Sequence, residues 1–280
     1  MQYKTILTIV ENKKDAELLL PIARDIAQEF NAHLICIRPS IKIHTPYILQ
    51  SFITKDVIEL IYEKDEIINE EIKKIFDAAT SAQDFVAEYR EETTKSSEKI
   101  SMLERDAYRS DLVIASSRRW AFTTNINVDP IHKLIVESGR PCLVVPDGYK
   151  SKHIPQNILF AWRASAAAST AAHNAIGFMK RAKKTTLMTV NKKKTVTAES
   201  LTDGHEMAVM LDRHGANINI WHASLSKKTI ADQIVSEARN AGHDLIVMGA
   251  GHHGSGYRMI YNDTAKSVIQ TATVPVLVSS

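Results

Sequence analysis

The sequence is poor in cysteine and has no long apolar run. Its only two cysteines in 280 residues, Cys36 and Cys142, lie in short apolar stretches, and no C-x-x-C spacing occurs. This placement predicts reduced core thiols and no cysteine-based metal site. No apolar run approaches the ~20 residues needed to span a bilayer, and the first residues show no signal-peptide pattern. We therefore expect a cytoplasmic protein without a membrane-spanning segment.

Motifs for catalysis and for nucleic-acid binding are also missing. There is no G-x-S-x-G elbow, and the serines have no base that can be assigned to them. Aromatic residues make up 6% of the chain and do not alternate with its lysine runs, which argues against nucleic acid as a partner. The 11 histidines show no ligand spacing typical of a zinc site. The sequence therefore predicts neither a catalytic residue nor a metal site.

Charge is divided unequally along the chain. Residues 1–146 hold 19 basic and 23 acidic side chains, which leaves 16 basic and 9 acidic side chains for the remainder. Lysine runs of this kind usually belong to solvated loops. The alternative interpretation is that the basic second half attracts an anionic ligand.

The chain contains an internal repeat. The segment D-L-V-I-A at 111–115 recurs as D-L-I-V-M at 244–248, and P-C-L-V-V at 141–145 recurs as P-V-L-V-S at 275–279. The two copies are thus offset by 133 and 134 residues, which indicates two similar units in tandem.

The repeat and a short polar stretch with Gly and Pro divide the chain into three parts. We expect a first domain at 1–146, a linker at 147–155 and a second domain at 156–280. Within each domain, short β-branched runs that are apolar on both faces alternate with helical patterns, which predicts a parallel sheet covered by helices on both sides. The fold class is therefore α/β, with two tandem doubly wound five-stranded parallel-sheet domains. The predicted strands are 4–10, 33–38, 85–89, 111–115, 141–145, 157–162, 185–190, 217–222, 244–248 and 275–279. The predicted helices are 13–30, 56–79, 95–108, 129–138, 166–182, 199–214, 227–241 and 262–271.

This arrangement resembles the tandem branch of the universal stress protein family. The run D-L-I-V-M-G at 244–249 is similar to that family's fourth strand entering its phosphate loop, and T-V-P-V-L-V at 273–278 is similar to its last strand. The resemblance implies an adenine nucleotide alpha hydrolase-like fold and a non-enzymatic role in the stress response through protein partners or a ligand. It also implies that strands 141–145 and 275–279 pair within one chain. Whether two chains form a homodimer is left open.

The family's ATP-binding motif is altered in both halves. That motif reads G-x-x-G, nine residues, then G-[S/T], so that glycine backbone and helix amides hold phosphate. The second half begins it at Gly249 but has His252 at the second glycine and Asn262-Asp263 at the final pair. An acidic residue there disfavours phosphate and favours a helix cap before Thr264. The first half has no glycine between Leu112 and Gly139, so we expect no phosphate loop in it.

A candidate ligand site is therefore predicted in the second half alone. After its first strand comes Arg163, which could pair with a phosphate or carboxylate; the alternative is an exposed residue before a helix capped by Ser165. Two functions stay open, a non-enzymatic protein that acts through partners and a regulator that binds ATP, AMP or another anion. Slow ATP hydrolysis is a third reading, and it would need a phosphate site. The candidate site residues are Gly249, Gly251, His252, Gly254, Ser255, Asn262, Asp263, Thr264 and Arg163.

Overall fold

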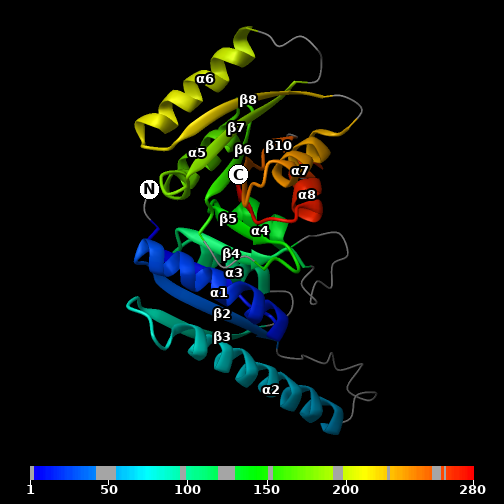
Figure 1. Cartoon of the computed structure of the whole chain (residues 1–280). Coiled ribbons are helices and arrows are strands. Elements are labelled where there is room, and N and C mark those ends of the chain that lie inside the picture. The colour runs from blue at the N-terminus through cyan, green and yellow to red at the C-terminus, as the bar shows by residue number, and fades with distance from the viewer. Residues whose placement is uncertain are drawn as a thin grey trace.

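The computed structural model of the chain is shown in Figure 1. It describes residues 3–41, 55–94, 99–118, 130–150, 154–191, 198–225, 228–253, 260–261 and 263–280. Strands and helices alternate along the chain, and the strands form one long sheet that runs through the whole molecule. No described helix is long and apolar enough to cross a membrane.

The first half of the chain alternates five strands with four helices. In order, these elements are β1 (Thr5–Ile9), α1 (Lys13–Phe30), β2 (His33–Ile41), α2 (Lys55–Thr80), β3 (Ala87–Thr94), α3 (Lys99–Ala107), β4 (Leu112–Ser116), α4 (Pro130–Ser138) and β5 (Cys142–Val145). The expected helix at 13–30 has the predicted bounds because both of its ends are capped. The side chain of Asn12 accepts a hydrogen bond from the Asp15 amide, and Asn31 ends the helix with φ of 46°.

The second half repeats this order and adds a small hairpin. Its elements are β6 (Asn157–Trp162), α5 (Ala166–Met179), β7 (Lys184–Asn191), α6 (Ala198–Arg213), β8 (Ile218–Ser224), α7 (Ile230–Asn240), β9 (Leu245–Gly249), β10 (His252–His253), β11 (Ile260–Tyr261), α8 (Asp263–Thr271) and β12 (Val276–Ser279). The hairpin of β10 and β11 forms a separate two-stranded sheet. The sequence did not predict it, since two-residue strands carry no periodicity to detect.

The ten long strands have the order β3-β2-β1-β4-β5-β12-β9-β6-β7-β8. Within each half all neighbouring strands are parallel. In both halves the first strand lies between the second and the fourth, which is the doubly wound order. Helices α1, α2, α5 and α6 contribute to the apolar core on one face of the sheet, and α3, α4, α7 and α8 contribute to the core on the other. The expected α/β fold class is confirmed.

The two halves meet at an antiparallel pair of strands. Leu143 in β5 lies opposite Leu277 in β12, and Val144 lies opposite Val276. The pairing expected for these two segments is therefore present, and it covers an edge that each half would otherwise expose. Because the pair is antiparallel, the carboxyl ends of the parallel strands in the two halves lie at opposite edges of the sheet. The edge at which a doubly wound half binds ligands therefore differs between the two halves.

Candidate functional site

Charged side chains gather where β1 and β4 of the first half end. Arg118, two residues after β4, forms an ion pair with Asp147 beyond β5 and lies 3.7 Å from the carboxylate of Asp15 in α1. Glu11, just after β1, is also buried. Two buried carboxylates share this place with one guanidinium. Because the described carboxylates outnumber the guanidinium, an anionic ligand is disfavoured here.

The protonation of Asp15 reflects this environment. Burial raises the pKa of the Asp15 carboxyl above its ordinary value, the nearby Arg118 partly offsets that effect, and Glu11 adds to it. The carboxyl keeps a hydrogen bond of 2.7 Å from the side-chain amide of Asn12. This group is a structural part of the first turn of α1.

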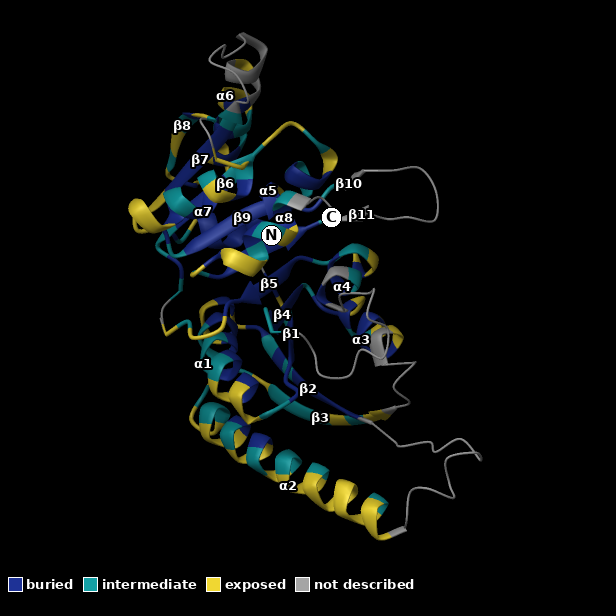
Figure 2. Cartoon of the chain, turned by 90° about the vertical axis from the view of Figure 1, so that its right-hand side faces the viewer, coloured by how far each residue is buried: buried dark blue, intermediate teal, exposed yellow. Residues whose placement is uncertain are grey.

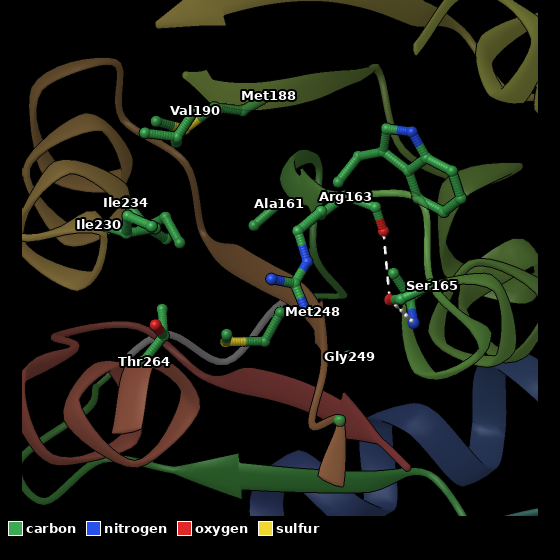
Figure 3. Close-up of a pocket in the computed structure, with 13 residues that line it drawn as sticks. Ala161, Arg163, Ser165, Met188, Val190, Ile230, Ile234, Met248, Gly249 and Thr264 are labelled. Carbon is green, nitrogen blue, oxygen red and sulfur yellow. Dashed lines mark hydrogen bonds between the residues drawn. The ribbon is translucent and has the colours of Figure 1, made fainter. Parts of the chain in front are cut away.

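The corresponding part of the second half contains a pocket (Figure 3). It lies where β6 and β9 end and is bordered by β7, α7 and the first turns of α5 and α8. Its cavity volume is about 100 Å³, and its mouth is open to solvent. The lining residues are Ala161, Trp162, Arg163, Ser165, Ala168, Met188, Val190, Ile230, Ile234, Met248, Gly249, Gly251 and Thr264.

One wall of the pocket is apolar and is built by three elements. It is formed by Met188 and Val190 from β7, Ile230 and Ile234 from α7, and Met248 from β9. All five belong to the core on the face of the sheet covered by α7 and α8, or pack against it. The pocket is thus an opening at the margin of that core.

Trp162 belongs to the other face of the sheet. Its ring packs against Phe160 with the ring centroids 5.7 Å apart, and both residues contribute to the core beneath α5. Alternation along β6 explains this, because successive side chains of a strand point to opposite faces. The Trp162 ring is therefore a packing element rather than part of the apolar wall.

Among the described lining residues, Arg163 alone carries a charge. It follows β6 directly and is exposed. Figure 3 shows its guanidinium directed toward the pocket, near Met248. Among the described residues, Arg163 takes part in no ion pair, so no described carboxylate neutralises its charge.

The backbone beside Arg163 is held by the start of α5. The hydroxyl of Ser165 donates to the carbonyl oxygen of Arg163 at 3.2 Å and accepts a hydrogen bond from the amide of Ala168 at 3.3 Å. The expected cap at Ser165 is thus confirmed. It fixes the turn from which the arginine side chain extends.

Gly249 lies in tight contact with the first turn of α5. A Cβ atom at Gly249 would lie 2.4 Å from the amide nitrogen of Ala168 and 2.5 Å from the carbonyl carbon of Ala167. The next amide, of Ala250, donates to the carbonyl oxygen of Ser279 at 2.7 Å. The packing of a strand end against a helix therefore requires this glycine, whether or not a phosphate binds.

The structure brings some of the predicted site residues together. Arg163, Gly249, Gly251 and Thr264 line the same pocket. His252 belongs to β10, where it pairs with Tyr261, and Asp263 is the first residue of α8. The other three, Gly254, Ser255 and Asn262, lie outside the described residues. A role for any of these residues in binding stays a prediction.

The apolar wall was not predicted as part of a site. Met188 and Val190 looked like ordinary strand residues, and Ile230 and Ile234 like an ordinary helix face. A signal does exist, because Val190 and Met248 stand near the carboxyl ends of their strands, where α/β proteins bind ligands. That signal cannot be separated from core packing without the tertiary structure.

In the described part of the chain, no group of three metal-ligating side chains comes together.

Comparison with known proteins supports the fold and the family. Residues 155–280 match the model of the universal stress protein family. Among solved structures, the chain is similar to a universal stress protein from Archaeoglobus fulgidus DSM 4304, with 17% identity, a TM-score of 0.72, and coverage of 100% of this chain and 99% of that one. A functionally unknown protein from Pseudomonas aeruginosa PAO1 has 15% identity and a TM-score of 0.60, with coverage of 99% and 92%. No curated protein matches the sequence.

These matches agree with the resemblance found in the sequence. The two solved structures span almost the whole chain, so they share the arrangement of both halves, and at these identities they show the fold. The family match itself covers the half that contains the pocket. Residues 155–280 thus match the universal stress protein family, and the whole chain shares its fold with a solved structure of a universal stress protein.

Proposed function

We propose that this protein is a cytoplasmic, non-enzymatic stress-response protein that binds a small anionic ligand in its second half and acts through protein partners. The observation that carries this proposal is the guanidinium of Arg163, which is directed toward a pocket whose other described lining residues are uncharged. In the first half, the described arginine after the fourth strand, Arg118, is paired with Asp147. We therefore assign ligand binding to the second half alone.

We further propose that residues 1–146 and 156–280 are the two domains and that they act as one body. The continuous sheet across β5 and β12 supports this proposal. A signal from the ligand would reach a partner through the joined sheet and its helices. Gly249, Gly251 and Thr264 are the proposed ligand contacts beside Arg163, because they border the same pocket.

A binding experiment tests the proposal. Purified protein is titrated calorimetrically, and its melting temperature is followed, with ATP, AMP, inorganic phosphate and simple carboxylates at up to millimolar concentration. We expect at least one anion to bind and to stabilise the fold by mass action. Arg163→Gln should abolish the stabilisation, whereas Arg213→Gln, at an exposed position in the last turn of α6, should preserve it.

Two results would contradict the proposal. Absence of stabilisation by every anion in the series would exclude a ligand site of this kind. Steady release of phosphate from ATP by the wild-type protein, lost in Arg163→Gln, would replace a non-enzymatic role with slow hydrolysis.

A further inference from the structure

We infer that the ligand of this pocket is a small organic anion with a single negative charge and an apolar body, of the monocarboxylate class, rather than a nucleotide. This inference rests on the ligand-binding function proposed above and specifies the chemistry of the ligand. Three properties of the pocket carry it: its single charge, the scarcity of free polar groups around that charge, and its apolar wall.

The charge of the pocket matches one carboxylate. Arg163 is the one charged residue among the 13 described residues that line it. A guanidinium can hold a carboxylate through two parallel hydrogen bonds, which fixes the ligand's orientation as well as its charge. A triphosphate would bring several negative charges to a pocket whose described lining neutralises one.

Several polar groups near the guanidinium are already engaged within the protein. The Ala250 amide is bonded to Ser279, and the Ser165 hydroxyl is bonded both to Arg163 and to Ala168. The Cα of Gly249 faces the backbone of α5, which leaves no room for a side chain. Phosphate sites rely on several free amides that converge on the anion. These groups do not provide such a cradle.

The wall opposite the guanidinium suits hydrocarbon. Val190 and Ile230 are partly exposed at the pocket, and Met188, Ile234 and Met248 form its buried floor. An alkyl or aryl group placed there would gain from leaving water.

Three matched probes test this inference on the full-length protein. Hexanoate has both the charge and the apolar body, hexanamide has the body without the charge, and acetate has the charge with almost no body. Calorimetric titration should give the tightest binding for hexanoate, by about tenfold or more over each of the other two, as expected when both contacts contribute. AMP and inorganic phosphate are titrated in parallel.

Variants assign each contact to its residue. Arg163→Gln should weaken the binding of hexanoate by about tenfold or more and leave the affinity for hexanamide nearly unchanged. Val190→Thr keeps the shape of the side chain but replaces a methyl group with a hydroxyl. It should therefore weaken the binding of hexanoate and of hexanamide to a similar extent. The exposed Arg213→Gln serves as the control and should change neither. Far-ultraviolet circular dichroism and melting curves verify that each variant is folded.

The outcomes separate this inference from the proposed function. Tight binding of AMP or phosphate without binding of hexanoate would overturn the monocarboxylate class while supporting an anion site. Equal hexanoate affinity in wild type and Arg163→Gln would overturn the inference, because the charge would then have no role. If no anion binds, hexanoate included, both the monocarboxylate inference and the proposed ligand-binding function would be overturned.

Discussion

The hydroxyl of Tyr3 donates a hydrogen bond of 2.5 Å to the main-chain carbonyl oxygen of Asn174, 171 residues away. Tyr3 precedes β1 and Asn174 lies in α5, so the bond joins the two halves of the molecule. The Tyr3 ring is fully buried, and its centroid lies 4.8 Å from that of Phe30 and 5.4 Å from that of Phe178. Burial raises the pKa of the Tyr3 hydroxyl, which therefore stays protonated and able to donate.

Tyr3→Phe should destabilise the protein by about 1 kcal/mol. The ring packing is kept, and the substitution removes one buried hydrogen bond between the halves. The free energy of unfolding in urea measures the effect. Tyr108→Phe is the matched control, because that side chain is 48% exposed and its hydroxyl can bond to water. An equal, near-zero effect of both substitutions would show that the bond to Asn174 contributes nothing.

Gly249→Ala should destabilise the protein by about 1–3 kcal/mol, even without any ligand. Its new Cβ would overlap backbone atoms of Ala167 and Ala168, which cannot move as a flexible side chain can. Gly251→Ala should be nearly neutral, since its Cβ would meet only the Cβ of Ala167 at 3.9 Å. Urea unfolding of the two variants gives the comparison. A stable Gly249→Ala variant would refute the packing explanation for this glycine.

Asp15→Asn should gain stability relative to wild type as the pH rises. The ordinary pKa of this carboxyl is 3.8 and the folded-state pKa is higher. Above 3.8 the native state therefore binds more protons than the unfolded chain, and wild-type stability falls until the pH exceeds the folded-state pKa. Unfolding free energies of both proteins between about pH 4 and pH 7 measure the trend. A difference independent of pH would contradict it.

Asp147→Asn should show the opposite trend. The hydrogen bond from Arg118 lowers the pKa of the Asp147 carboxyl below its ordinary 3.8, so this group stabilises the native state at neutral pH. That contribution disappears as the pH falls through the lowered value. The deficit of the variant should thus be present near neutrality and should shrink in acid, as urea unfolding at both pH values would detect. A deficit that grows in acid would be inconsistent with the ion pair.

Asp65→Asn should destabilise the protein by about 1–3 kcal/mol by weakening the attachment of α2 to the sheet. Asp65 pairs with the buried guanidinium of Arg38 and accepts a hydrogen bond of 2.7 Å from Ser40. Glu91 would be left as the only carboxylate on Arg38, and hydrogen bonds to a charged group are worth more than neutral ones. Asp77→Asn, on the exposed side of α2, is the control. Amide hydrogen exchange across α2 should speed up in the first variant alone.

Most of the fold could be predicted from the sequence, because strand and helix periods are local properties. The helix at 13–30 and the strand at 157–162 have their predicted bounds, and the other long elements differ from prediction by a few residues at their ends. The resemblance also identified the pairing of β5 with β12. The hairpin of β10 and β11 was missed because its strands are too short to show a pattern.

The candidate site was predicted less completely. Arg163 and Gly249 were predicted as site residues and both line the pocket, but the structure gives Gly249 a packing role that the sequence analysis did not predict. Its contact with α5 depends on how closely a helix from another part of the chain approaches, which no local pattern encodes. The interaction of Arg118 with Asp15 and Asp147 likewise joins residues far apart in sequence.

The sequence alone determined that this protein is a tandem α/β structure. Hydrophobic periodicity and helix caps are local patterns, and the internal repeat is visible when two segments of the sequence are compared. The tertiary structure decided what lies at the carboxyl ends of the strands in each half. In the first half, charged side chains from α1 and from the segments after β4 and β5 converge there, and in the second half Arg163 lies at the edge of a wall built by β7, β9 and α7. The physical reason is that electrostatics and packing depend on distances in space, and those distances exist only once the sheet has assembled.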